Sequence, residues 1–113
     1  MKRIIIAALL TCLVSPALGM EDTGRYYVLG HGGDSCGSWT AEKNKKSPKY
    51  IIYGVWTDGF ITSYNFHQPG LYDVAKGTDT AGRTAWIDNF CAANPLTSIS
   101  RATGALIRFL KDR

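Results

Sequence analysis

The stretch Gly30–Trp39, which reads GHGGDSCGSW, places residues that could act as nucleophiles among glycines. Its centre, GDSCG at 33–37, fits the G-x-S-x-G turn that exposes the nucleophilic serine of many hydrolases, and the preceding His-Gly-Gly has the composition of an oxyanion loop. The run CGSW at 36–39 comes close to the C-G-S-C-W sequence around the cysteine of papain-type proteases. Either match would make the chain an enzyme.

The surrounding sequence argues against both active sites. A nucleophile turn needs a buried strand leading into Ser35 and a large sheet, but glycines precede Ser35 and the chain is short. Only His31 and His67 could serve as a base. The papain-type motif lacks its second cysteine, because Trp39 follows Ser38 directly. We therefore interpret Ser35 as a helix cap and expect no catalytic residue: the chain is predicted not to be an enzyme.

Residues 1–19 have the features of a signal peptide. Lys2 and Arg3 give a positive start, 4–14 is an almost unbroken apolar run, and Ala17 and Gly19 are the small residues before a cut after Gly19. The apolar run is too short to span a bilayer stably, so an uncleaved anchor is the weaker alternative. We expect an exported protein, periplasmic or secreted, with no membrane contact after cleavage.

Cleavage changes both the cysteine content and the charge. It removes Cys12 and leaves Cys36 and Cys91, and an even pair in a short exported chain predicts one disulfide. The net charge falls from +4 to +2 because Lys2 and Arg3 are lost. The basic balance is therefore partly a property of the signal peptide, and we expect no nucleic-acid partner.

Apolar periodicity and capping residues predict an all-α fold with four helices over residues 35–113. A Gly-rich segment at 20–34 precedes them and is expected to be an extended, flexible leader. Ser35 caps a helix over 36–44, and Ser47-Pro48 begins a second helix that runs to Phe66. A long loop over 67–78 leads to a third helix capped by Thr78 or Asp79.

The last helix is predicted to begin with Asn94 as its cap and Pro95 in its first turn. Each helix has an apolar side that is expected to face the core. In the second helix these residues are Ile51, Ile52, Val55, Trp56, Phe60 and Tyr64; in the third, Ala85, Trp86, Ile87, Phe90 and Cys91; in the last, Ile99, Ala102, Leu106, Phe109 and Leu110.

The order of these features resembles that of small periplasmic proteins with the HdeA-like fold. The resemblance rests on the signal peptide, on Ser35-Cys36, on GVWTDGF at 54–60, on WIDNFCAANP at 86–95 and on an amphipathic closing helix. The group includes acid-stress chaperones and the Rap/Tai-type immunity proteins of type VI secretion. The resemblance implies a helical domain with one disulfide between Cys36 and Cys91, and a protein that acts by binding and needs no cofactor.

The expected function is that of a periplasmic inhibitor or immunity protein, and the alternative is an acid-activated chaperone. Recognition usually lies in loops on a rigid scaffold and depends on aromatic anchors. We therefore predict a protein-binding surface at Tyr64, Phe66, His67 and Tyr72, and a homodimer is also compatible with the sequence. His31, Asp34 and His67 could in principle bind a metal, but their spacing matches no structured site, so none is expected.

Overall fold

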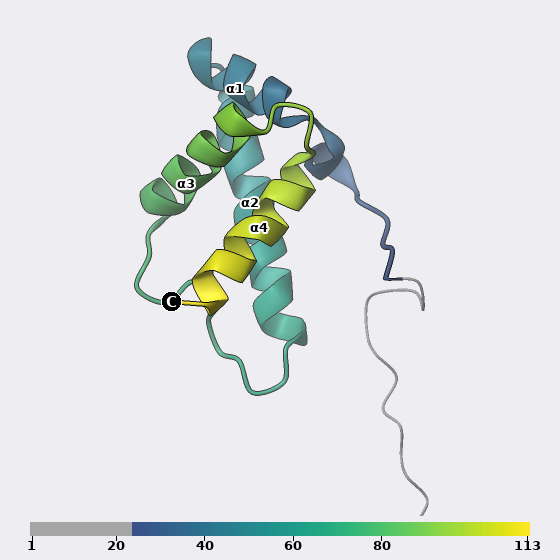
Figure 1. Cartoon of the computed structure of the whole chain (residues 1–113), viewed down its shortest axis with the longest axis vertical. Coiled ribbons are helices and arrows are strands. Elements are labelled where there is room, and N and C mark those ends of the chain that lie inside the picture. Colours follow the sequence, from purple (N-terminus) through teal and green to yellow (C-terminus); the bar gives the residue numbers. More distant parts are fainter. Residues whose placement is uncertain (1–23) are drawn as a thin grey trace, which may run out of the picture.

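The structure, a computed structural model, describes residues 24–113 and contains a short 3₁₀ helix followed by four α-helices (Figure 1). The 3₁₀ helix η1 spans Gly30–Gly33, and the α-helices are α1 (Cys36–Asn44), α2 (Pro48–His67), α3 (Thr80–Ala93) and α4 (Ile99–Lys111). The described residues form no strand, and the predicted all-α, four-helix fold is confirmed. The predicted signal peptide lies outside the described residues.

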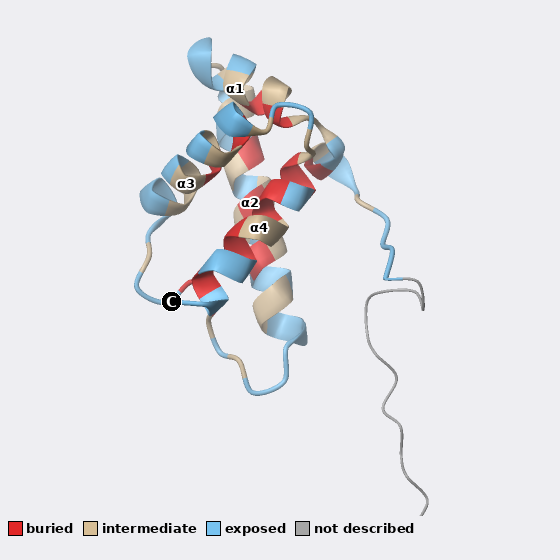
Figure 2. Ribbon diagram, in the orientation of Figure 1, coloured by how far each residue is buried: buried red, intermediate tan, exposed pale blue. Residues whose placement is uncertain are grey.

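The four helices enclose one core. α4 packs along α2, α3 packs against both α1 and α4, and η1 lies against α2 and α4. Buried residues lie where these helices face one another (Figure 2). The largest fully buried side chains are Trp39, Tyr53, Ile87, Ile99 and Leu106, with Thr103 and the two cysteines. Because every α-helix contributes to this list, no helix can separate without exposing core.

Side chains cap the first turns of α1, α3 and α4. Ser35 Oγ accepts a hydrogen bond from the Ser38 backbone N–H at 3.1 Å, and Asp79 Oδ1 accepts one from the Gly82 backbone N–H at 2.7 Å. Both caps were predicted, and each satisfies a backbone donor that the helix leaves without a partner. α2 begins with Pro48 in its first turn, as predicted, but the Ser47 hydroxyl donates to Glu42 instead of capping the helix.

The prediction for the start of the last helix is wrong. Asn94 ends α3, and its side-chain amide donates to the Phe90 carbonyl at 2.9 Å. α4 begins at Ile99, with Ser98 as its cap. The residues between are held by the first turn of α1: the Gly37 backbone N–H donates to the Pro95 carbonyl at 2.8 Å. This long-range pairing keeps the 94–97 backbone out of the helix.

The buried side of α2 is also rotated from the predicted one. Its buried residues are Tyr53, Thr57 and Ile61, which follow one another at intervals of four. Trp56, Phe60 and Tyr64 lie partly buried beside them, as expected for neighbours of the core. The remaining predicted core residues of this helix are exposed: Ile51 by 68%, Ile52 by 49% and Val55 by 66%. α2 therefore has an apolar outer face.

The expected extended leader is helical and packed at its C-terminal end. Gly30–Gly33 form η1, Gly32 is buried, and the Trp56 indole N–H donates to the Leu29 carbonyl at 2.9 Å. A Cβ placed on Gly32 would lie 2.0 Å from Trp56 Cζ2, so only glycine lets η1 approach the indole this closely. Leu29 and η1 thus belong to the folded domain.

We predict that Gly32→Ala destabilises the domain by about 1–3 kcal/mol, the usual cost of forcing an extra methyl group into a packed site. Denaturant unfolding followed by tryptophan fluorescence measures the change, and Trp56 emission should shift because its ring must move. Gly33→Ala is the matched control, since a Cβ there meets no atom within 4 Å. Equal stability of the two variants would show that η1 does not pack on Trp56.

Candidate functional site

The GHGGDSCGSW stretch is a structural junction in this fold. Ser35 Oγ is engaged at the start of α1, 3.2 Å from Ser38 Oγ, and Cys36 forms a disulfide with Cys91. Backbone bonds join the stretch to the residues before α4: Cys36 N–H donates to the Thr97 carbonyl at 2.7 Å, and Ile99 N–H to the Asp34 carbonyl at 2.9 Å. Ser35 and Cys36 therefore have structural roles, and the absence of enzyme activity stays a prediction.

His31 and Asp34, two of the residues weighed for chemistry, join a polar cluster on the side of α2. Asp34 Oδ2 lies 3.1 Å from His31 Nδ1 and 3.4 Å from Lys49 Nζ, and it accepts a hydrogen bond from the Tyr53 hydroxyl at 2.9 Å. Burial alone raises the pKa of Asp34, but the hydrogen bonds from Tyr53 and His31 and the nearby Lys49 outweigh it, so the pKa lies below its ordinary value. The cluster ties η1 to α2.

A second carboxylate, Asp88, lies on α3 and is only 13% exposed. Asp88 Oδ1 accepts hydrogen bonds from Trp39 Nε1 at 2.7 Å and from the Tyr50 hydroxyl at 2.8 Å, and Oδ2 lies 3.0 Å from Lys43 Nζ. Burial raises the pKa of Tyr50, and the hydrogen bond to Asp88 raises it further. Asp88 thus links α3 to α1 and α2.

The three residues considered for a metal do not meet. His67 ends α2 fourteen residues beyond Tyr53, about 20 Å along a helix axis, whereas His31 stacks edge-on to Tyr53. His67 Nδ1 lies 2.8 Å from the Ser63 carbonyl oxygen. Within residues 24–113, no group of three His, Cys, Asp or Glu side chains is arranged to hold a metal ion.

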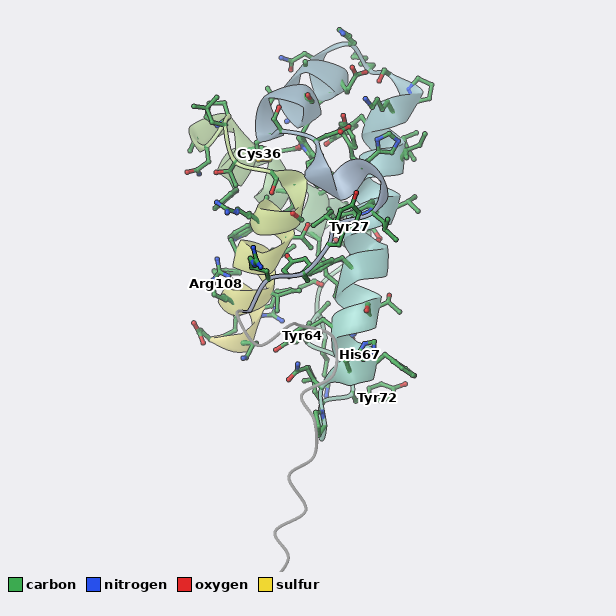
Figure 3. All side chains as sticks on the ribbon, turned by 90° about the vertical axis from the view of Figure 1, so that its right-hand side faces the viewer. Tyr27, Cys36, Tyr64, His67, Tyr72 and Arg108 are labelled. Atoms are coloured by element: carbon green, nitrogen blue, oxygen red, sulfur yellow. A yellow bond between two sulfur atoms is a disulfide. The ribbon has the colours of Figure 1, made fainter. Side chains whose placement is uncertain are left out.

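The predicted binding residues lie together at the far end of α2 (Figure 3). Phe66 is 83% exposed, Tyr72 is 96% exposed, and His67 is exposed with its ring edge-on to Phe66. Tyr64 differs, since it is half-buried and packs against the core. Tyr64 therefore belongs to the edge of the core. Phe66, His67 and Tyr72 are the exposed members of the group, which we call the aromatic tip.

The loop that carries Tyr72 consists of two tight turns. Leu71 N–H donates to the Gln68 carbonyl at 3.2 Å, and Thr78 N–H donates to the Ala75 carbonyl at 3.0 Å. In each turn the third residue is a glycine with positive φ, Gly70 at 74° and Gly77 at 80°. Glycine adopts this conformation without steric cost, which explains Pro69-Gly70 and Lys76-Gly77 in the sequence.

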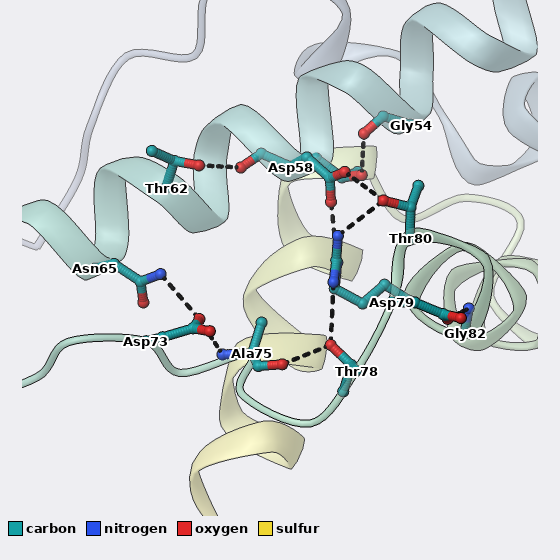
Figure 4. Close-up of polar contacts among 12 residues, drawn as sticks. Gly54, Asp58, Thr62, Asn65, Asp73, Ala75, Thr78, Asp79, Thr80 and Gly82 are labelled. Atoms are coloured by element: carbon teal, nitrogen blue, oxygen red, sulfur yellow. Dashed lines mark hydrogen bonds and ion pairs between the residues drawn. The ribbon is translucent and has the colours of Figure 1, made fainter.

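Side-chain hydrogen bonds attach this loop to α2 and α3 (Figure 4). The Asn65 amide donates to Asp73 Oδ1 at 3.2 Å, and its oxygen accepts from the Val74 backbone N–H at 2.9 Å. Arg83 donates to Asp58 at 3.0 Å and to the Thr78 hydroxyl at 3.1 Å. Val74 and Ala75 are buried between these two attachments. The loop therefore presents Tyr72 on a fixed backbone.

A second exposed apolar surface lies along the middle of α2. Tyr26 and Phe60 have ring centroids 6.2 Å apart, and a groove of about 340 Å³ runs between residues 26–29 and α2, with Trp56 and Gly59 in its lining. Tyr27 is 88% exposed, and it lies nearer η1 than the aromatic tip does (Figure 3). The exposed aromatic residues therefore form two surfaces instead of one.

Comparison with known proteins leaves the family open. The chain matches no protein-family model, and neither the curated proteins nor the solved structures include a detectable match. The resemblance to the HdeA-like group stays a prediction. The confirmed disulfide is typical of exported proteins, and no helix among residues 24–113 is long and apolar enough to cross a membrane.

Proposed function

We propose that the protein is an exported binding protein of the inhibitor or immunity type, which docks a protein partner through the aromatic tip. The observation that supports this most directly is Tyr72, 96% exposed on a loop whose backbone is held from both sides by Asn65 and Arg83. A large aromatic side chain on a fixed loop loses little conformational entropy when it binds.

The hydrogen bonds of Asn65 allow a test of whether binding needs the fixed conformation of the loop or only its exposed side chains. Asn65 is half-buried beneath the loop, and its side chain bonds both Asp73 and the Val74 backbone. Removing it should release the loop without removing any aromatic contact. A partner that needs the fixed loop conformation will then bind more weakly, because ordering the loop adds an entropic cost to binding.

The test is capture from periplasmic extract at neutral pH by the immobilised mature protein. We predict a stoichiometric partner whose affinity falls at least about 30-fold with Tyr72→Ala, as for an aromatic hot spot. Phe66→Ala should act similarly, and Asn65→Ala should give a smaller loss. Binding is then measured by calorimetry with the purified partner.

Leu96→Ala is the matched control. Leu96 is as exposed as Tyr72, at 97%, but lies in the α3–α4 connection at the opposite end of the molecule (Figure 1). A partner lost equally with Leu96→Ala and Tyr72→Ala would contradict docking at the tip, and so would a partner retained by both. A partner that binds the Tyr26–Leu29 groove would be lost with Tyr27→Ala instead.

A second candidate function, an acid-activated chaperone, is favoured by the Asp34 cluster. The carboxylate of Asp34 connects η1 to Tyr53 and Lys49, so its protonation removes charged contacts between η1 and α2. Loss of these contacts would loosen the segment over Trp56 and expose apolar surface of α2. The same surface would then be available to unfolded clients.

The pH dependence follows from the lowered pKa of Asp34. A carboxyl whose pKa is lower in the folded state stabilises the fold above its unfolded pKa, and this stabilisation is lost as the pH falls below about 4 through the folded pKa. We predict that Asp34→Asn is less stable than the wild type at pH 7 and loses less stability between pH 5 and pH 2. Unfolding followed by near-UV circular dichroism at each pH measures the stability of both proteins. Parallel pH profiles for Asp34→Asn and the wild type would contradict the prediction.

A further inference from the structure

A cleft in the described part of the chain lies between α3 and α4. It has a volume of about 460 Å³, within the range of small-molecule binding sites. The buried residues Leu106 and Leu110 form its apolar base, and Trp86 and the half-exposed Phe109 line it with ring centroids 5.6 Å apart. This lining suits an aliphatic or aromatic group.

One end of the cleft carries a fixed positive charge. Arg113 lines the cleft, and its guanidinium donates to the carbonyls of Lys76 at 3.0 Å, Val74 at 3.4 Å and Leu110 at 3.3 Å. It forms no ion pair with any carboxylate among residues 24–113. Arg83, the other arginine in the lining, is neutralised by Asp58 at 3.0 Å. Three hydrogen bonds to backbone carbonyls therefore hold the Arg113 guanidinium at this end of the cleft.

A hydrogen-bond donor without a partner lies in the same lining. Trp39 and Trp56 each donate their indole N–H within the fold, whereas Trp86 Nε1 donates to no atom of the described residues. The lining also contains the Asp79 carboxylate, which caps α3 by accepting from the Gly82 backbone N–H. The positive end of the α3 helix offsets part of its charge. The cleft thus combines an apolar base, the Arg113 guanidinium and the side chain of Trp86.

We infer that this cleft binds a small amphiphilic anion, a medium-chain or aromatic carboxylate, with its apolar body on Leu106 and Phe109 and its carboxylate near Arg113. The charge complementarity of Arg113 selects the acid over a neutral molecule of the same shape, since hydrogen bonds between charged groups are about twice as strong as neutral ones. This inference does not depend on the aromatic tip or on a protein partner.

The test compares octanoate with octanamide, which differ only in the charged group, by titration of ¹⁵N-labelled protein at concentrations below micelle formation. Octanoate should shift the indole N–H signal of Trp86 saturably and leave those of Trp39 and Trp56 unchanged. Octanamide should bind about tenfold more weakly. Arg113→Gln should weaken octanoate binding by about tenfold and leave octanamide binding unchanged.

Arg108→Gln is the matched control, because it removes the same charge from an exposed position of α4 outside the cleft (Figure 3). Phe109→Gln, at a half-exposed position that tolerates change, should weaken both ligands. Equal effects of Arg113→Gln and Arg108→Gln would overturn the inference, as would equal affinity for acid and amide in the wild type. A saturable shift of the Trp56 indole alone would place the ligand in the Tyr26–Leu29 groove and overturn it as well.

Discussion

Replacing either disulfide cysteine by serine will lower the free energy of unfolding by roughly 4 kcal/mol, because the bond between Cys36 and Cys91 closes a loop of 55 residues. Without the bond the unfolded chain gains the conformations that the loop had excluded. A small domain has only about 5–15 kcal/mol of stability in total, so the loss should decide whether this one stays folded at 37 °C. Urea unfolding of the oxidised protein and of each variant measures the change.

The two single variants and the double variant should be equally unstable, because each removes the same bond. The wild-type protein reduced with a thiol should match them, and it has no altered side chain. Ser35→Ala is the local control: it removes the cap of the same helix and should cost only about 1 kcal/mol. A loss below about 1 kcal/mol on reduction would show that the packing of α1 against α3 holds this region without the bond.

The sequence predicts most of the fold because the relevant signals are local. A cap such as Ser35 or Asp79 satisfies a donor two or three residues away, and a proline such as Pro48 fixes its own φ. These effects do not depend on the rest of the molecule, and all three residues begin helices as predicted. The disulfide could also be predicted, because the expected cleavage of residues 1–19 would leave one pair of cysteines.

The start of α4 could not be predicted in the same way. Asn94-Pro95 has the local features of a helix start, but the Pro95 carbonyl accepts from Gly37, and the Thr97 carbonyl accepts from Cys36. These bonds join segments far apart in the chain, and the gain from satisfying buried backbone donors exceeds the local preference for helix. The same pairing explains why residues 30–34, which look flexible in the sequence, are held in the fold.

The exposure of Phe66 and Tyr72 could be expected from the sequence, because neither residue is among the apolar positions predicted to face the core. The roles of Asp34 and Asp88 were missed. Tyr53 lies 19 residues from Asp34 and Trp39 lies 49 residues from Asp88, and only tertiary packing brings each pair together. One signal was available: buried tyrosine and tryptophan side chains usually find a hydrogen-bond partner. A chain this rich in both must supply acceptors, and its few carboxylates were the candidates.

Removing the Asp88 carboxylate is the second change with a large expected effect. Asp88→Ala leaves the indole N–H of fully buried Trp39 and the hydroxyl of Tyr50 without their acceptor. A buried donor without a partner costs about 1–3 kcal/mol, so we predict a total loss of about 3 kcal/mol. The Lys43 contribution is small because that ammonium is 45% exposed. Denaturant unfolding measures the loss, and the pKa of Tyr50 should fall because the neighbouring charge is gone.

Asp58→Ala is the matched control for Asp88, because it also removes a carboxylate that joins two helices. Asp58 pairs with Arg83 at 3.0 Å but is 34% exposed, against 13% for Asp88. Asp58→Ala removes the acceptor of Arg83 Nε, but the same guanidinium keeps its bonds to Thr78 and Thr80 and the pair is more exposed to water, so the loss should stay near 1 kcal/mol. Asp88→Asn should fall between the two, since its amide oxygen can still accept from Trp39. We expect a larger loss for Asp88→Ala because it leaves the Trp39 and Tyr50 donors without an acceptor. Equal losses of unfolding free energy for Asp58→Ala and Asp88→Ala would contradict this explanation.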